Sequence, residues 1–103
     1  MIKVFISQGM QGLSDTDILN KRNEIINYVN LMENDEIEII DSFFKYEEPA
    51  DVKAPGLAHL GKSLELLATA DVAYFARDYE GYRGCTIEHE CALRYGIPVR
   101  FYD

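Results

Sequence analysis

The sequence lacks an apolar stretch that approaches the roughly 18 residues needed to span a membrane, so we expect no membrane partner. The first residues, MIKVFIS, hold only a short apolar run with no small-residue cleavage site after it, which favours a strand over a signal peptide. Repeats, low-complexity tracts and linkers are also missing. We therefore expect one cytoplasmic domain over residues 1-103.

Basic residues are scarce, because ten Lys and Arg stand against 18 Asp and Glu and give a net charge of −8. This field would repel a phosphate backbone, and no stripe of Lys and Arg exists to counter it. We therefore expect no nucleic acid as partner. A small nucleotide is compatible with the acidity, since one arginine or a helix N-terminus can reverse the potential inside a pocket.

The sequence contains two cysteines. Cys85 and Cys91 are six residues apart on one expected helix, where a disulfide is geometrically awkward, so we expect reduced thiols. Cys85 and His89 share a helix face, but Cys91 lies elsewhere on the helix. Zinc needs three or four convergent ligands, and only the distant His59 could add another donor. We expect neither a metal nor another cofactor.

Apolar periodicity predicts strands that alternate with helices. The expected strands span residues 2–7, 37–40, 71–76 and 97–102. The first and third expected helices span about 14–33 and about 85–95. The second helix carries Leu57, Leu60, Leu64 and Leu67 on one face. Ser14 with Asp17 makes a capping-box-like start for the first helix, and Gly96 ends the last one. Residues 43–55 are expected to form a long loop, which is often functional.

This order predicts a three-layer α/β fold, in which right-handed crossovers place four parallel strands in the flavodoxin-like order 2-1-3-4 with flanking helices. In such sheets ligands bind at the carboxyl ends of the strands, at the switch point between strands 1 and 3. The loop 8–13 and the segment 77–88 converge there.

Glu88 is the candidate for chemistry, because it lies about one turn into the last helix, where the helix dipole favours its ionised form. If it projects into the crevice, it could act as a nucleophile toward an electrophilic sugar carbon. Glu90 points roughly 200° away around the helix. The alternative is that Glu88 is a solvated residue or a partner of the dipole, since surface charges are the norm.

Weaker candidates for ligand contacts surround this glutamate. The turn formed by Gln8, Gly9, Met10, Gln11 and Gly12 could cradle an anion with its backbone N–H groups, although taken alone it is better explained as a glycine-bearing turn. Arg77 and Arg83 could contact phosphate or carboxylate. Tyr79 and Tyr82 could stack on a base, whereas core packing is the better explanation for Tyr74.

The segment GCTIEHECALRYGIPV (residues 84–99) resembles the Gly-x-x-x-Glu…Ala…Gly-x-Pro-Val signature of nucleoside 2-deoxyribosyltransferases, and more loosely that of 2′-deoxynucleoside 5′-phosphate N-hydrolases. The opening VFISQGMQG and the stretch GKSLELLATADVAYFA resemble the same superfamily. Together with RGCTIEHECA, they are most similar to a domain family without assigned function that is often found in bacteriophage genomes.

The resemblance implies a nucleoside or nucleotide ligand with an N-glycosidic bond, and a homo-oligomer in which a neighbouring subunit completes the site. It implies that Glu88 attacks C1 of the deoxyribose, that Gly84 lets the chain approach sugar or phosphate, and that the turn Gln8–Gly12 cradles the substrate. Phe5 stands where the enzymes usually carry a tyrosine that orients the glutamate. Ser63 stands where they usually carry an aspartate that manages the proton on the leaving base.

These two departures leave the function open. Without the tyrosine we expect Glu88 to lose a positioning hydrogen bond, and without the aspartate we expect general acid help, typically worth about 100- to 10,000-fold, to be missing. One hypothesis is an N-glycosidase or 2-deoxyribosyltransferase that acts through Glu88. The alternative is a non-catalytic, phage-encoded protein that sequesters a nucleotide or nucleotide-derived signal. The third is a purely structural domain.

Overall fold

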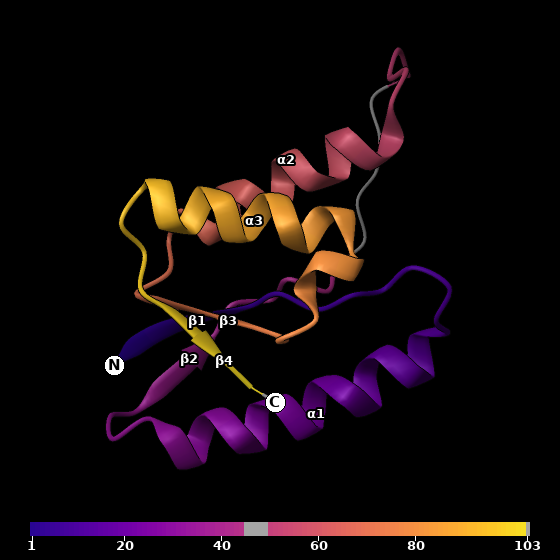
Figure 1. Ribbon diagram of the computed structural model, residues 1–103. Helices are drawn as coiled ribbons and strands as arrows, with labels where there is room; N and C mark the ends of the chain where they lie inside the picture. Colours follow the sequence, from indigo (N-terminus) through magenta and orange to yellow (C-terminus); the bar gives the residue numbers. More distant parts are fainter. Residues whose placement is uncertain (45–49, 103) are drawn as a thin grey trace.

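The computed structural model describes residues 1–44 and 50–102 of the chain (Figure 1). Within these residues the strands are β1 (Ile2–Ile6), β2 (Ile37–Ile39), β3 (Val72–Phe75) and β4 (Val99–Phe101). The helices are α1 (Asp15–Met32), α2 (Pro55–Leu67) and α3 (Arg83–Arg94), and a short 3-10 helix, η1 (Tyr79–Gly81), precedes α3. The predicted alternation of strands and helices is confirmed.

The strands form one parallel sheet in the order β2-β1-β3-β4, as the sequence predicts. Figure 1 shows α1 on one face of this sheet and α2 with α3 on the other, which gives three layers. Both faces of the central strands are therefore covered, and this explains why Val4–Ile6 and all of β3 are buried. The fold is a three-layer α/β sandwich.

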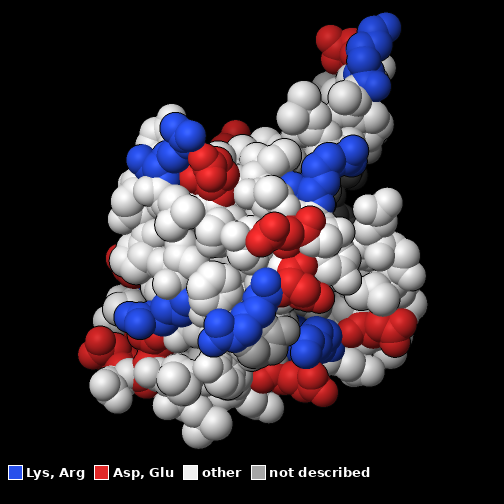
Figure 2. All heavy atoms as spheres, in the orientation of Figure 1, with Lys and Arg blue, Asp and Glu red and all other residues white. Residues whose placement is uncertain are grey.

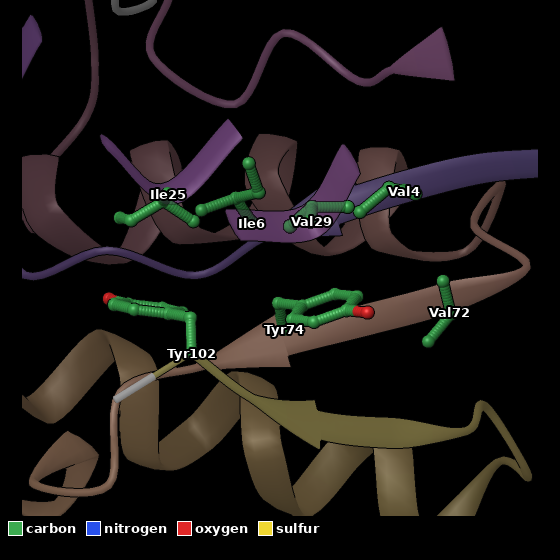
Figure 3. Packing of buried hydrophobic residues seen from close by; sticks show 7 residues of the cluster. All are labelled: Val4, Ile6, Ile25, Val29, Val72, Tyr74 and Tyr102. Carbon is green, nitrogen blue, oxygen red and sulfur yellow. The ribbon is translucent and has the colours of Figure 1, made fainter. Parts of the chain in front are cut away.

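The alternation of side chains along β1 divides the core between the two faces of the sheet. One cluster packs toward α1 and is shown in Figure 3; it contains Val4, Ile6, Ile25, Val29, Val72, Tyr74 and Tyr102. Phe5 belongs to the other cluster, with Leu67 of α2 and Ala92 of α3. Residues just past the end of β1 continue this alternation, and this decides which of them reach α3.

The ends of the helices follow local signals. Ser14 caps α1, because its Oγ accepts a hydrogen bond of 3.1 Å from the backbone N–H of Asp17, as predicted. Gly96, with φ of +76°, follows the last residues of α3, also as predicted. α3 begins at Arg83 rather than at Cys85, because the backbone is still extended at Tyr82 and turns helical directly after it.

The second helix departs from the predicted pattern. Leu57 is 68% exposed, although its spacing placed it on the apolar face. The amino-terminal end of α2, which contains Leu57, extends beyond the sheet (Figure 1). Ser63, in contrast, is buried. Of the predicted loop 43–55, residues 45–49 lie outside the described residues, and Pro55 already belongs to α2.

Among the described helices, none combines the length and the apolar character needed to cross a bilayer.

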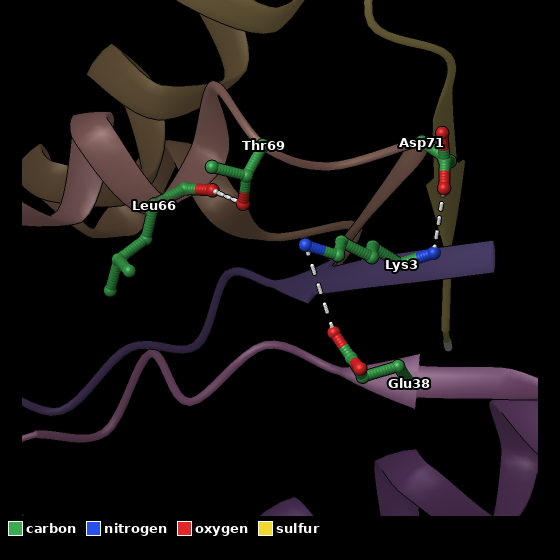
Figure 4. Close-up of polar contacts among 5 residues, drawn as sticks. All are labelled: Lys3, Glu38, Leu66, Thr69 and Asp71. Atoms are coloured by element: carbon green, nitrogen blue, oxygen red, sulfur yellow. Dashed lines mark hydrogen bonds and ion pairs between the residues drawn. The ribbon is translucent and has the colours of Figure 1, made fainter. Parts of the chain in front are cut away.

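Contacts at the amino-terminal edge of the sheet fix where β1 and β3 start (Figure 4). The backbone N–H of Lys3 donates a hydrogen bond of 2.7 Å to the carboxylate of Asp71, and the Lys3 ammonium lies 3.9 Å from the carboxylate of Glu38. The hydroxyl of Thr69 donates to the carbonyl of Leu66 over 2.7 Å and closes the end of α2. The carboxyl ends of the strands lie at the opposite edge of the sheet and take no part in these contacts.

A buried polar network holds the carboxyl ends of β1 and β2 against α1. The hydroxyl of Ser42 donates to the carbonyl of Ile6 over 2.8 Å and accepts from Nη1 of Arg22 over 3.1 Å. Nη2 of Arg22 donates to the carbonyl of Ile40 over 2.9 Å. Burial lowers the pKa of Arg22, and the nearby charge of Asp41 opposes this shift. One guanidinium thus joins α1 to two strand ends.

Replacing the hydroxyl at the centre of this network should destabilise the chain. We expect Ser42→Ala to lower the free energy of unfolding by about 1–3 kcal/mol, because buried groups of Arg22 and Ile6 lose their partner. Urea unfolding measures this change. The control is Thr16→Ala, an exposed hydroxyl on α1, for which a change below about 0.5 kcal/mol is expected. Equal effects of the two substitutions would contradict the prediction.

Candidate functional site

A cavity of about 210 Å³ lies beyond the carboxyl end of β1, where the following loop meets the first half of α2 and the first turns of α3. Ten of the residues singled out from the sequence line it: Phe5, Gln8, Gly9, Met10, Gln11, Ser63, Tyr82, Arg83, Gly84 and Glu88. Gly12 does not line it, because this exposed residue occupies a turn with φ of +80° farther along the loop. The residues that sequence reasoning did not place there are Ile6, Ser42, Gly56, His59, Leu60 and Cys85.

Glu88 of α3 is buried and is held by two hydroxyl groups. Oγ of Ser7 donates to Oε1 over 2.7 Å, and Oγ of Ser63 donates to Oε2 over 2.5 Å. Only 7% of the Glu88 residue is exposed, so it is not a solvated surface glutamate. The end of β1, α2 and α3 each contribute one of these three side chains.

Ser7 is itself fixed by its backbone. Its N–H donates to the carbonyl of Tyr74 over 2.9 Å, and its carbonyl accepts from the hydroxyl of Tyr102 over 3.1 Å. Phe5 has no hydroxyl to offer Glu88, and Ser7 supplies a positioning hydrogen bond instead. The period-two alternation of β1 could have revealed it, since Ser7 falls on the same side of the sheet as Phe5.

Gln8, the next residue, points the other way. Its Nε2 donates to the carbonyl of Ile18 in α1 over 2.8 Å, and 8% of the residue is exposed. Its Oε1 has no hydrogen-bond partner among residues 1–44 and 50–102. The side chain thus ties the loop to α1, on the face of the sheet opposite to Glu88.

Burial is the largest influence on the pKa of Glu88. Burial raises the pKa of Glu88 above its ordinary value of about 4.5, while the hydroxyls of Ser63 and Ser7 and the charge of His59 act to lower it. The net direction is upward. The helix dipole was expected to favour the ionised form, whereas burial shifts the pKa of Glu88 toward the protonated form.

The two cysteines are free thiols, as expected, and neither is set up as a nucleophile. Cys85 lines the cavity, and burial raises its pKa to about 11, although a hydrogen bond with Ser7 opposes the shift. Cys91 packs at the edge of the apolar cluster between the sheet, α2 and α3. The described part of the chain contains no group of three or more His, Cys, Asp or Glu that could hold a metal ion.

The two histidines lie in different surroundings. His89 stacks on Tyr79, with ring centroids 4.1 Å apart, and meets the edge of Phe75 at 5.1 Å, so it does not join Cys85 in the cavity. His59, which the sequence left distant, lines the cavity from α2 one turn before Ser63. Phe44 stacks on its ring with a centroid distance of 4.6 Å and an interplanar angle of 9°.

The tyrosine candidates also lie in different surroundings. Tyr82 lines the cavity, and its ring packs so closely on Gly9 that a Cβ added there would lie 2.4 Å from it. Tyr79 instead packs among His89, Phe75 and Phe101. Tyr74 is in the core, as expected, and its hydroxyl donates to Glu33.

Of the two candidate arginines, one lines the cavity and the other does not. Arg83 lines the cavity, whereas the guanidinium of Arg77 lies over the ring of Phe101, 5.4 Å from its centroid. Figure 2 shows acidic and basic groups interspersed over the visible face, without a basic stripe there. Arg83 is thus the arginine that lines the cavity among the described residues.

Comparison of the chain with protein-family models, with curated proteins and with solved structures finds no match.

The close approach of Tyr82 to Gly9 gives one testable prediction. We expect Gly9→Ala to lower the free energy of unfolding by about 1–3 kcal/mol, because the new methyl group must displace the Tyr82 ring. The same substitution in a Tyr82→Ala background should cost clearly less. Gly84→Ala is the control, since a Cβ there would lie 3.9 Å from Leu60, an ordinary contact. An equal cost in both backgrounds would refute the clash.

The buried carboxylate gives a second prediction, which concerns pH. Because the pKa of Glu88 is raised in the folded chain above the value of about 4.5 expected when unfolded, the folded chain binds more protons between these two pKa values. The stability contributed by this group therefore falls as the pH rises through that window. Glu88→Gln removes the titration, so its stability relative to the wild type should increase from about pH 4 to about pH 8 in urea unfolding.

The exposed neighbour on the same helix serves as the control for this measurement. Glu90→Gln should show no such trend, since the Glu90 side chain is exposed to solvent. A stability difference between Glu88→Gln and the wild type that stays constant with pH would contradict the prediction.

Proposed function

We propose that the protein cleaves the N-glycosidic bond of a nucleoside or nucleotide, as an N-glycosidase or 2-deoxyribosyltransferase-like enzyme with Glu88 as nucleophile. The observation that carries this proposal is the buried carboxylate of Glu88 on α3, held by hydroxyls from the end of β1 and from α2. Buried ionisable groups with shifted pKa values in a cavity are concentrated at functional sites. The sequence resemblance of residues 84–99 supports the same assignment.

The proposed reaction uses the carboxylate in two steps. An oxygen of Glu88 attacks C1 of the sugar, the bond from C1 to the base nitrogen breaks, and a glycosyl ester forms. Water or a second base then attacks C1 and releases Glu88. Ser7 and Ser63 each hold one carboxylate oxygen, and their donated hydrogen bonds favour the ionised form that the attack requires.

The size of the cavity indicates which part of the ligand it holds. Its volume of about 210 Å³ is below the roughly 300–1,000 Å³ of typical small-molecule sites, so we propose that it takes the sugar. The remainder of the ligand extends outward along the loop after β1. A neighbouring copy of the chain, in a homo-oligomer, would then complete the site.

A non-catalytic binding protein is the second candidate, and a specific observation favours it. The pKa of Glu88 is raised by burial, and a protonated carboxyl group is a poor nucleophile. Ser63 also stands where the resembling enzymes carry an aspartate. The same cavity would in that case sequester a nucleotide or a nucleotide-derived signal, as a phage-encoded protein could.

Release of free base distinguishes the two candidates. We expect the wild type to release base from 2′-deoxynucleosides or their 5′-monophosphates, as measured by chromatography. Glu88→Gln and Glu88→Ala should each reduce the rate by more than about 10,000-fold, because the attacking group is lost. Glu90→Gln, which changes an exposed carboxylate that does not line the cavity, should retain the rate.

The opposing outcomes are equally defined. Thermal stabilisation by a nucleotide without base release would support the binding protein and refute the enzyme. If none of these nucleosides and nucleotides is cleaved and none stabilises the protein, both candidate functions are refuted.

A further inference from the structure

Departure of a nucleobase requires a proton donor as well as a nucleophile. A base that leaves as an anion is a poor leaving group, and a positioned general acid contributes typically about 100- to 10,000-fold. Ser63 cannot fill this place in the proposed reaction, because its hydroxyl already donates to Glu88. If the chain is an enzyme, another side chain in the cavity must deliver the proton.

Five titratable side chains line the cavity among the described residues: His59, Tyr82, Arg83, Cys85 and Glu88. Glu88 is the nucleophile. Arg83 does not give up its proton in proteins. Burial raises the pKa of Cys85 to about 11, so this thiol keeps its proton. The Tyr82 ring packs on Gly9, and a phenol is a weak acid. Histidine is the side chain that most often transfers protons in enzymes.

The placement of His59 suits this task. It lies four residues before Ser63 on α2, and side chains at that spacing share one face of a helix. Ser63 contacts Glu88 directly, so this face of α2 is turned toward the nucleophile. The charge of His59 also acts on the carboxylate of Glu88.

Phe44 orients the imidazole. The two rings are nearly parallel, with an interplanar angle of 9° and centroids 4.6 Å apart, so Phe44 covers one face of His59. The two ring nitrogens lie at the edge of the imidazole, which a stacked partner does not cover. An edge-on approach to the base nitrogen that is bonded to C1 of the sugar is compatible with this arrangement.

We propose that His59 is the general acid that protonates the leaving base, an inference that rests on the proposed function. As Glu88 attacks C1 and the bond from C1 to nitrogen breaks, the electron pair of that bond goes to the base nitrogen, which takes a proton from a ring nitrogen of His59. The now neutral imidazole then accepts a proton from the water that attacks C1. The carboxylate of Glu88 and the protonated imidazole are both restored, and the products are the free base and the free sugar.

A leaving group that needs no proton tests this assignment. Nicotinamide departs neutral from its N-glycoside, whereas the four standard bases depart as anions unless they are protonated. We expect His59→Gln to slow base release from the four 2′-deoxynucleoside 5′-monophosphates by about 100- to 10,000-fold. In a single turnover, where release precedes the attack of water, release of nicotinamide from its 2′-deoxyriboside 5′-phosphate should change by less than about threefold, and Glu88→Gln should abolish both reactions.

The second histidine of the chain provides the matched control. His89→Gln changes an imidazole that stacks on Tyr79 outside the cavity, so both reactions should proceed at the wild-type rate. Equal slowing of both reactions by His59→Gln, or slowing of neither, would overturn the role of His59 and leave the proposed function intact. A wild-type protein that releases base from none of these substrates would instead refute the proposed function itself.

Discussion

A carboxylate removed from water requires partners, and this requirement organises the carboxyl edge of the sheet. Glu88 finds its partners in Ser7 and Ser63, which belong to different elements. The end of β1, the middle of α2 and the first half of α3 must therefore meet within hydrogen-bonding distance. The backbone contacts that fix Ser7 serve the same end, because a hydroxyl that moved would leave a buried oxygen without its donor.

Much of the fold could be predicted from the sequence, because it depends on local signals. The apolar strands, the Ser14 cap and Gly96 determine where elements begin and end, and handedness then leaves the order 2-1-3-4 as the simplest topology. Leu57 shows the limit of this reasoning, since periodicity identifies an apolar face but not whether a neighbour covers it. The extent to which α2 projects past the sheet is a property of the whole arrangement.

The site was predictable in its location and less so in its chemistry. Glu88 and most of the loop after β1 could be assigned to one place because the carboxyl ends of strands 1 and 3 define it. The bond between Ser7 and Glu88 joins residues 81 positions apart; the alternation of β1 indicates the side of the sheet on which Ser7 lies, but not its partner. His59 is likewise distant in the sequence from the last helix, although α2 brings it to the cavity. Burial, which sets the direction of the Glu88 pKa, appears only when these contacts exist.

The hydrogen bond from Ser63 also couples the docking of a whole helix to a single proton. Helix α2 is held to the body of the domain by the buried Ser63 and Leu67 and by the partly buried Leu64 and Leu66. If α2 separated, solvent would reach Glu88 and its affinity for protons would return toward that of a hydrated glutamate. Higher pH thus favours the undocked helix, and lower pH favours the docked helix. The protonation state of Glu88 is therefore linked to the docking of α2.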